Sequence, residues 1–377
     1  MKVLFDCRYT RLVRHDGISR YSAGLVGAFA KLHPVTMLIS DERQLAMLPD
    51  LPWVRIPAGT SALEPWIALW INREKPDVVF SPMHTMGSAH RRYRLILTLH
   101  DLVFYRIHTP PRDYSWYVRL IWWAYHLSYV PGRLVLDRAE AIVTGSHNCA
   151  DEMSAVRLTR RPVTVVHPGV DSSGLPARVH SAARTLIYMG TFLPNKNVET
   201  LVRAMHLLPG YRLHLLSRID DETRARLSAA APADSLVFEN GVSDERYLEL
   251  LRTCTAMVSA CRDEGFGIPL IEALASATPL VISDIPVFRE VGGTAATYFA
   301  PDDAEQFARS VLAIDTAEVW DALSAASLVQ AAAFTWEESA TELLRLVQTL
   351  PPRNRPRWHT LRSGRRTAQG RALPRQS

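Results

Sequence analysis

Short apolar runs alternate with stretches whose apolar residues recur at helical spacing, and this alternation most restricts the fold of the chain. Continuous apolar strands separated by helices are typical of parallel sheets covered on both faces. Two such series follow one another, so the sequence predicts an α/β protein with two doubly wound domains. The predicted strands are 2–6, 35–40, 77–81, 94–100, 141–146 and 163–168, then 184–190, 211–217, 235–241, 256–260, 279–283 and 296–300.

The expected domain boundaries follow from these two series, because 377 residues exceed what one hydrophobic core usually organises. We expect a first domain over residues 1–168 and a linker rich in Pro, Gly and Ser over 169–181. The second domain is expected over 182–334, followed by a C-terminal helix at 335–350. Residues 351–377 have no periodicity and are predicted to be a disordered basic tail.

The net charge of +5 comes from the C-terminal tail. Residues 351–377 contain eight arginines and no acidic residue, and subtracting them leaves −3 for the preceding 350 residues. A mildly acidic body argues against a specific nucleic-acid-binding protein. The four cysteines are scattered without a CxxC pair, which excludes a zinc ribbon or a disulfide scaffold and suits a cytoplasmic protein. The apolar run at the N-terminus is too short for a signal peptide, and no uninterrupted stretch of 18 apolar residues exists, so neither a signal peptide nor a spanning helix is expected.

The strongest motif is RDEGFGIPLIEALASATPLV at residues 262–281, which begins where a predicted strand ends. Gly265 and Gly267 permit a close backbone approach, and Pro269 suits the first position of the helix that follows. The N-terminus of that helix favours an anion such as phosphate. Glu264 and Glu272 flank this helix start, eight positions apart. The motif therefore predicts a phosphate-binding site flanked by two carboxylates.

The segment EGFGIPLIE resembles the Glu-x7-Glu motif of the retaining family-4 glycosyltransferases, and the resemblance extends over most of residues 1–335. It implies the GT-B fold, in which two Rossmann-like domains face each other across a cleft and the C-terminal helix crosses back to the first domain. It also implies metal-independent transfer of a sugar from a nucleotide-sugar, with retained anomeric configuration. Glu264 would act as a catalytic residue near the anomeric centre, and Glu272 would bind the ribose hydroxyls. The sugar and phosphate would be lined by Gly265, Phe266, Gly267 and Ile268.

A second candidate segment, YMGTFLPNKN, contains Lys196, the only lysine in the last 300 residues. A cation at this place can stabilise a departing diphosphate. Thr191 stands where the family usually has an arginine, a departure that resembles a subgroup containing many mannosyltransferases. The sequence leaves open what replaces that arginine, and Arg262 is one candidate.

Four further residues are predicted at the cleft by their positions next to strands and helices. His100 and Asp101 end an apolar strand of the first domain, and the family resemblance makes His100 a catalytic contact to the donor sugar. Gly17 opens a helix after the first strand and resembles the glycine loop that approaches the diphosphate or the acceptor. Val242, just after a glycine, is assigned to the nucleobase by the same resemblance.

The function expected from these residues is a retaining glycosyltransferase of cell-envelope polysaccharide biosynthesis. GDP-mannose is the first expectation for the donor, the acceptor is a glycan or glycolipid, and no cofactor or metal is expected. Two alternatives stay open: another GT-B enzyme, such as an epimerase or phosphorylase, and a non-catalytic GT-B scaffold. The base, sugar, acceptor, linkage and oligomeric state are not determined by the sequence.

An aromatic segment, WYVRLIWWAYHLSYV at residues 116–130, is too short to span a bilayer. One interpretation is a helix packed on the first domain's core. The other is an interfacial helix at lipid headgroups, where Trp and Tyr are favoured, with the arginine tail attracted to anionic lipid. The second interpretation predicts peripheral contact with the inner face of a membrane.

Overall fold

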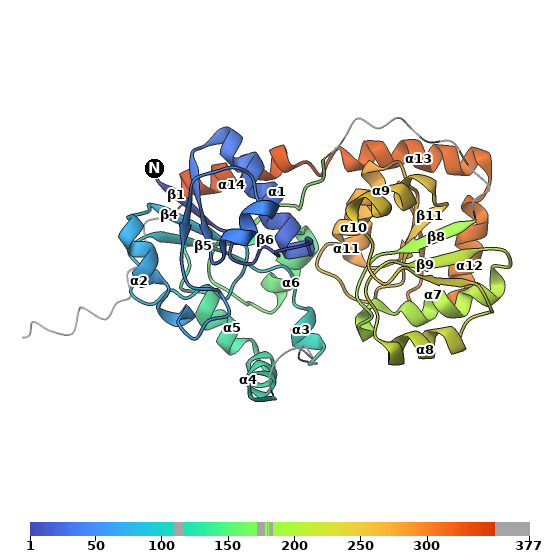
Figure 1. Ribbon diagram of the computed structural model, residues 1–377, viewed down its shortest axis with the longest axis horizontal. Helices are drawn as coiled ribbons and strands as arrows, with labels where there is room; N and C mark the ends of the chain where they lie inside the picture. The colour runs from blue at the N-terminus through green and yellow to red at the C-terminus, as the bar shows by residue number, and fades with distance from the viewer. Residues whose placement is uncertain (109, 111–115, 172–177, 179, 181–183, 351–377) are drawn as a thin grey trace, which may run out of the picture.

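A computed structural model of the protein describes residues 1–108, 110, 116–171, 178, 180 and 184–350. Its strands form two parallel sheets, one in each lobe of the molecule (Figure 1). The first sheet has seven strands in the order β3-β2-β1-β4-β5-β6-β7. These strands are β1 (Val3–Asp6), β2 (Val35–Ile39), β3 (Trp53–Arg55), β4 (Val78–Ser81), β5 (Arg94–Thr98), β6 (Ala141–Thr144) and β7 (Val163–Val165).

The second sheet has six strands in the order β10-β9-β8-β11-β12-β13. In both sheets, two crossovers run to one side of the first strand and the chain then returns to the other side, which is the order of a doubly wound nucleotide-binding domain. The strands are β8 (Thr185–Tyr188), β9 (Arg212–Leu215), β10 (Leu236–Phe238), β11 (Ala256–Ser259), β12 (Leu280–Ser283) and β13 (Ala296–Phe299).

Helices connect the parallel strands in both lobes. Those of the first lobe are α1 (Gly17–Leu32), α2 (Ala68–Ile71), α3 (Val103–Arg106), α4 (Trp116–His126), α5 (Tyr129–Leu136) and α6 (His147–Ala155). Those of the second are α7 (Val198–Ala204), α8 (Asp221–Ala229), α9 (Asp244–Thr253), α10 (Ile268–Ala275), α11 (Pro286–Gly292), α12 (Ala304–Ile314) and α13 (Ala317–Ala331). Short 3-10 helices lie at η1 (Glu42–Met47), η2 (Glu64–Trp66), η3 (Asn72–Glu74), η4 (Pro194–Lys196) and η5 (Met205–Leu207).

Each sheet is buried on both faces, as its uninterrupted apolar strands require. In β1, Val3 and Phe5 belong to one hydrophobic cluster and Leu4 belongs to another. The same alternation occurs in β11, where Met257 and Val258 join different clusters. Successive side chains of a strand point to opposite faces, so each sheet separates two cores. The prediction of two doubly wound α/β domains is confirmed.

The last described helix, α14 (Trp336–Thr349), lies beside α1 in the first lobe although it follows α13 of the second lobe (Figure 1). Trp336, Leu343 and Val347 are buried in the same cluster as Phe5 of β1. The chain therefore crosses between the lobes twice, once after β7 and once before α14. The predicted basic tail, 351–377, lies outside the described residues.

The aromatic segment forms two helices rather than one. The break between the two helices lies at Ser128, whose backbone is extended and which directly precedes α5. One side of α4 packs on α3, where the ring of Trp122 meets Phe104 edge-on at 5.1 Å. The other side carries exposed apolar residues, namely Trp116, Leu120, Ile121 and Trp123. Within the described ranges, no helix is long and apolar enough to cross a membrane.

Candidate active site between the two domains

The candidate site lies where the carboxyl ends of the two sheets face each other. In doubly wound sheets, ligands bind at the point where the strand order reverses, which here lies between β1 and β4 and between β8 and β11. A cavity of about 340 Å³ occupies this place and is lined from both domains. Predicted site residues in its wall are Gly17, His100, Lys196, Glu264, Gly265, Phe266, Gly267 and Ile268.

The loop before α10 follows β11 and fits closely against the first domain. A Cβ atom on Gly265 would lie 2.6 Å from the backbone oxygen of His100, so only glycine allows this approach. The Gly265 carbonyl accepts a hydrogen bond of 2.9 Å from Ser146 Oγ, which also comes from the first domain. Gly267, with a φ of +96°, then turns the chain into α10. The sequence predicts Pro269 at the first position of that helix, but in the structure Pro269 is the second residue.

Lys196 and Glu264 form an ion pair inside the cavity. Lys196 ends the 3-10 helix η4, and the next residue, Asn197, is buried and donates to the backbone oxygens of Ala260 and Pro301 at 3.1 and 2.6 Å. Burial lowers the pKa of Lys196, but the charge of Glu264 and its hydrogen bond outweigh burial, so the pKa is raised overall. Lys196 is therefore a fixed cation at neutral pH.

A third carboxyl group, Asp101, lies beside this pair. Burial, and then the negative charge of Glu264, raise the pKa of Asp101 to about 6. Its Oδ1 accepts a hydrogen bond of 3.0 Å from the amide of Val103, which holds the side chain at the start of α3. The sequence placed Asp101 at the mouth of the cleft without assigning it a role.

His100 is held in one tautomer by its neighbours. Its Nε2 lies 2.8 Å from the backbone oxygen of Pro82, which can only accept, so Nε2 carries the hydrogen. Burial lowers the pKa of His100, which favours the neutral ring. The ring packs edge-on against Tyr21 at 5.3 Å. Its Nδ1 is then a hydrogen-bond acceptor.

A larger adjoining cavity, of about 810 Å³, contains the remaining predicted residues, Val242 and Glu272. Tyr247 donates a hydrogen bond of 3.0 Å to Glu272 Oε2, and Arg20 of the first domain lies 3.0 Å from Oε1 as an ion pair. Burial raises the pKa of Glu272, and the Arg20 charge opposes that shift. Oε1 is buried and has no hydrogen-bond partner among the described residues. Besides its ion pair with Arg20, this oxygen therefore keeps lone-pair capacity to accept a hydroxyl.

The structure places all ten predicted residues in these two cavities, but it does not place Arg262 there. Arg262 pairs with Asp302 and donates to the backbone oxygen of Pro194, so it is not the replacement for the arginine missing at Thr191. Thr191 itself lines both cavities. Arg20 and Tyr247, which both reach Glu272, are not among the residues predicted from the sequence. The one available signal for Arg20 is its position one helical turn after Gly17.

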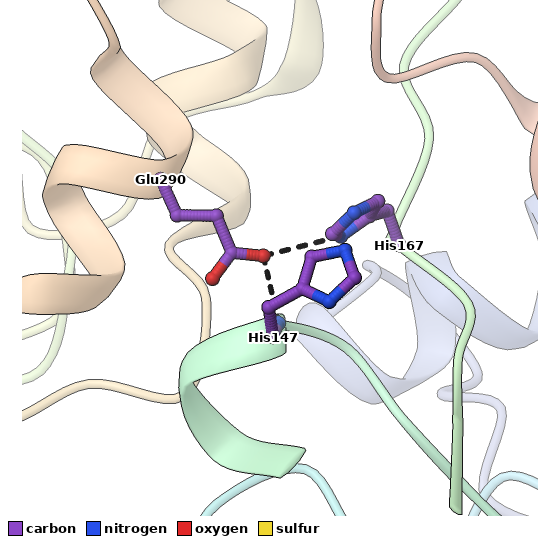
Figure 2. A group of neighbouring side chains, drawn as sticks. All are labelled: His147, His167 and Glu290. Carbon is purple, nitrogen blue, oxygen red and sulfur yellow. Dashed lines mark hydrogen bonds and ion pairs between the residues drawn. The ribbon is translucent and has the colours of Figure 1, made fainter. Parts of the chain in front are cut away.

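One group of side chains outside the two cavities has the residue types of a metal site. His147, His167 and Glu290 each offer one ligand atom, and these atoms lie within 4.8 Å of one another (Figure 2). Both Glu290 oxygens, however, accept backbone hydrogens of α6, from His147 at 2.8 Å and Asn148 at 3.0 Å. His167 Nδ1 donates to the Gly145 oxygen at 2.9 Å. These hydrogen bonds explain why the three side chains lie together, because Glu290 of α11 is bound to the start of α6. We therefore assign no metal to the group.

Comparisons with known proteins agree with this architecture. The family described as Glycosyltransferase Family 4 matches residues 15–173, and the family described as Glycosyl transferases group 1 matches residues 178–318. Among solved structures, sucrose-phosphate synthase from Thermosynechococcus elongatus has the same fold, with a TM-score of 0.71 at 17% identity. That match covers 93% of this chain and 98% of the synthase chain.

The curated relatives include mannosyltransferases. The chain is 26% identical to the O-antigen chain mannosyltransferase RfbU of Salmonella typhimurium, over 51% of this chain and 55% of the relative. It is also 26% identical to the GDP-mannose:cellobiosyl-diphosphopolyprenol alpha-mannosyltransferase of Komagataeibacter xylinus, over 57% of this chain and 58% of the relative. The chain thus spans little more than half the length of these two relatives.

The fold and the cleft residues define a two-domain enzyme of the GT-B class. Both domains match families of glycosyltransferases, and the two matches together span most of the chain. The chain belongs to the family-4 glycosyltransferases and resembles their mannosyltransferase members.

Proposed function

We propose that the protein transfers mannose from GDP-mannose to a glycan or glycolipid acceptor of the cell envelope, with retention of anomeric configuration and without a metal ion. The observation that carries the proposal is the juxtaposition of Lys196, Glu264 and the start of α10 in one cavity between the domains. A fixed cation and a helix N-terminus are suited to a departing diphosphate. The names of the mannosyltransferase relatives support the choice of sugar and base.

Four side chains of the cleft have a role in this proposal. Lys196 and the first amides of α10 hold the diphosphate, and Glu264 contacts the donor sugar near the anomeric centre. His100 accepts a hydrogen bond from a sugar hydroxyl through Nδ1, because Nε2 is committed to Pro82. Glu272 accepts a ribose hydroxyl through Oε1. The departing diphosphate assists removal of the proton from the acceptor hydroxyl, so no protein nucleophile is needed.

The donor is tested by nucleotide binding. The melting temperature of the full chain is measured with GDP-, UDP-, dTDP- and ADP-sugars, and GDP-mannose is expected to raise it most. Calorimetry then compares the variants Lys196→Gln and Glu272→Gln with Lys31→Gln, an exposed lysine on α1. Loss of one charge-assisted hydrogen bond costs about 1.5–3 kcal/mol, so the two cleft variants should bind GDP-mannose roughly ten- to a hundredfold more weakly. Unchanged affinity in folded cleft variants would remove both assignments.

The reaction is tested by product analysis. Transfer of labelled mannose to a lipid-linked or free glycan should continue in EDTA, because Lys196 and α10 supply the positive field. Activity that disappears in EDTA and returns with Mg²⁺ or Mn²⁺ would contradict the metal-free mechanism. The product linkage, determined by NMR, should have the anomeric configuration of the donor, and the opposite configuration would exclude retention.

We further propose that the protein acts in the cytoplasm and makes peripheral contact with the inner face of a membrane. Trp116, Leu120 and Trp123 recur at helical spacing on the exposed side of α4, with exposed fractions of 77, 56 and 42%. Arg119 is exposed between them. An amphipathic helix of this kind lies in the headgroup region of a bilayer. A surface-bound enzyme suits a lipid-linked acceptor, such as the diphosphopolyprenol in the name of one relative.

A further inference from the structure

The larger cavity is lined by four arginines, namely Arg11, Arg14, Arg20 and Arg218. Two of the four are neutralised locally. Arg11 pairs with Asp16 at 2.5 Å, and Arg20 pairs with both Asp244 and Glu272. These three carboxylates are the acidic residues in the cavity wall, so the wall offers no further counterion.

Arg14 and Arg218 have no such partner. Neither guanidinium forms an ion pair or a side-chain hydrogen bond with any residue in the described part of the chain. Both side chains are exposed to the cavity and its mouth. A guanidinium stays protonated at any physiological pH, so both charges are permanent.

The two side chains reach the same place from opposite domains. Arg14 lies in the loop between β1 and α1, whereas Arg218 follows β9. A methyl group placed on Gly241 would be 3.2 Å from Nη1 of Arg14 and 3.5 Å from Nε of Arg218. Two like charges repel when they converge in this way, and the repulsion is relieved when an anion lies between them.

We propose that Arg14 and Arg218 form a two-domain clamp for a diphosphate group at the mouth of the cleft. The clamp rests on the proposed sugar transfer and adds two cations in the larger cavity, which Thr191 also lines, to the Lys196 site of the smaller cavity. Planar guanidinium groups bind phosphate oxygens through paired hydrogen bonds. Two ligands of the proposed reaction contain a diphosphate group: the donor nucleotide and a lipid-linked acceptor. Because each domain contributes one arginine, a bound diphosphate also holds the domains together.

The clamp is tested on the full chain with the variants Arg14→Gln and Arg218→Gln. Calorimetry measures binding of GDP, of guanosine, and of farnesyl diphosphate as a short polyprenyl diphosphate. Each variant should lose about tenfold in affinity for a diphosphate and nothing for guanosine, and binding should depend less steeply on salt. Matched controls are Arg43→Gln in the first domain and Arg226→Gln in the second, whose exposed arginines lie outside both cavities.

The outcomes separate the two sources. If the variants lose affinity for GDP alone, the clamp binds the donor. If they lose affinity for farnesyl diphosphate alone, it binds the acceptor. Unchanged binding of both diphosphates in folded variants overturns the clamp, as does an equal loss in the control variants or with guanosine. If the wild-type protein transfers no mannose but binds a diphosphate through Arg14 and Arg218, the proposed function fails and the clamp stands.

Discussion

At the scale of single residues, the cleft brings the carboxyl group of Asp101, which burial makes costly to ionise, close to Lys196 and Glu264. Asp101 is the group whose titration is most informative, because its pKa is about 6 in the folded protein instead of 3.8. Between pH 4 and 6 the folded protein keeps a proton that the unfolded chain has released. The stability that protonation of Asp101 contributes to the folded protein is fully present below pH 3.8 and is lost as the pH rises through about 6.

The variant Asp101→Asn should remove this pH dependence. Its free energy of unfolding, relative to wild type, is expected to rise from pH 4 to pH 8 by at most about 3 kcal/mol, since one pKa unit corresponds to about 1.36 kcal/mol. Urea unfolding at each pH measures the difference. Asp50→Asn, at an exposed position, is the control and should show a constant difference. A constant difference for Asp101→Asn as well would mean that its carboxyl titrates normally.

The sequence predicted which residues carry chemistry better than it predicted their partners. Lys196, Glu264 and Glu272 stand next to strand ends and a helix start, and these are local features of the chain. Arg20 reaches Glu272 from a position 252 residues earlier, which no spacing rule can indicate. Ion pairs between domains depend on how the domains face each other, and that arrangement is set by packing along the whole interface.

At the scale of elements, apolar runs predicted the strands well because both faces of each sheet are buried. Every predicted strand has a counterpart, and the missed strand is β3, a three-residue edge strand whose Trp53 and Arg55 are exposed. An edge strand with little burial has no apolar run to detect. The break between α4 and α5 was also missed. Ser128 suits a helix start, and Pro131 is tolerated in the first turn of α5 but not within a continuous helix.

The loop before α10 allows a sharp test of how closely the two domains must approach. Gly265→Ala places a methyl group 2.6 Å from the backbone oxygen of His100, so the loop or the domains must shift. Overpacking of this kind costs about 1–3 kcal/mol, and sugar transfer should fall because Glu264 moves with the loop. The melting temperature and the transfer rate measure the two effects.

A matched glycine in α1 provides the control for this variant. A Cβ atom on Gly27 would have its nearest neighbour at 3.8 Å, so Gly27→Ala should raise stability by about 0.5–1 kcal/mol through helix propensity. It should leave sugar transfer unchanged. If Gly265→Ala were equally stable and active, the close approach of the loop would not be needed.

At the scale of the whole molecule, charged groups from one domain repeatedly meet groups from the other. Arg106 binds Asp263 through two contacts of 2.5 Å, and Glu290 accepts the first amides of α6 (Figure 2). An ion pair near the surface, such as the partly exposed Arg106–Asp263 pair, contributes little stability, at roughly 0–1 kcal/mol. Contacts of this strength therefore add little to holding the two domains together. The more extensive link between the domains is α14, which follows the second domain and buries its apolar residues in the core of the first domain.

The exposed face of α4 and the arginine-rich C-terminal segment together predict reversible binding to anionic membranes. Each basic residue near such a surface contributes about 1 kcal/mol within a Debye length of about 8 Å, whereas burial of apolar side chains is not screened by salt. Deleting 351–377, with its eight arginines, should weaken binding to anionic vesicles mainly at low salt. The double variant Leu120→Gln and Ile121→Gln should weaken binding at all salt concentrations.

Vesicle co-sedimentation, with and without anionic lipid, measures both effects on the same preparations. The matched control is Leu312→Gln with Val329→Gln, which removes two exposed apolar side chains from helices of the second domain. All variants should keep wild-type transfer to a water-soluble acceptor, since α4 does not line either cavity. A full-length protein that ignores anionic vesicles at low salt would contradict membrane docking. Equal weakening by the control pair would show that exposed apolar area in general, and not α4, causes the binding.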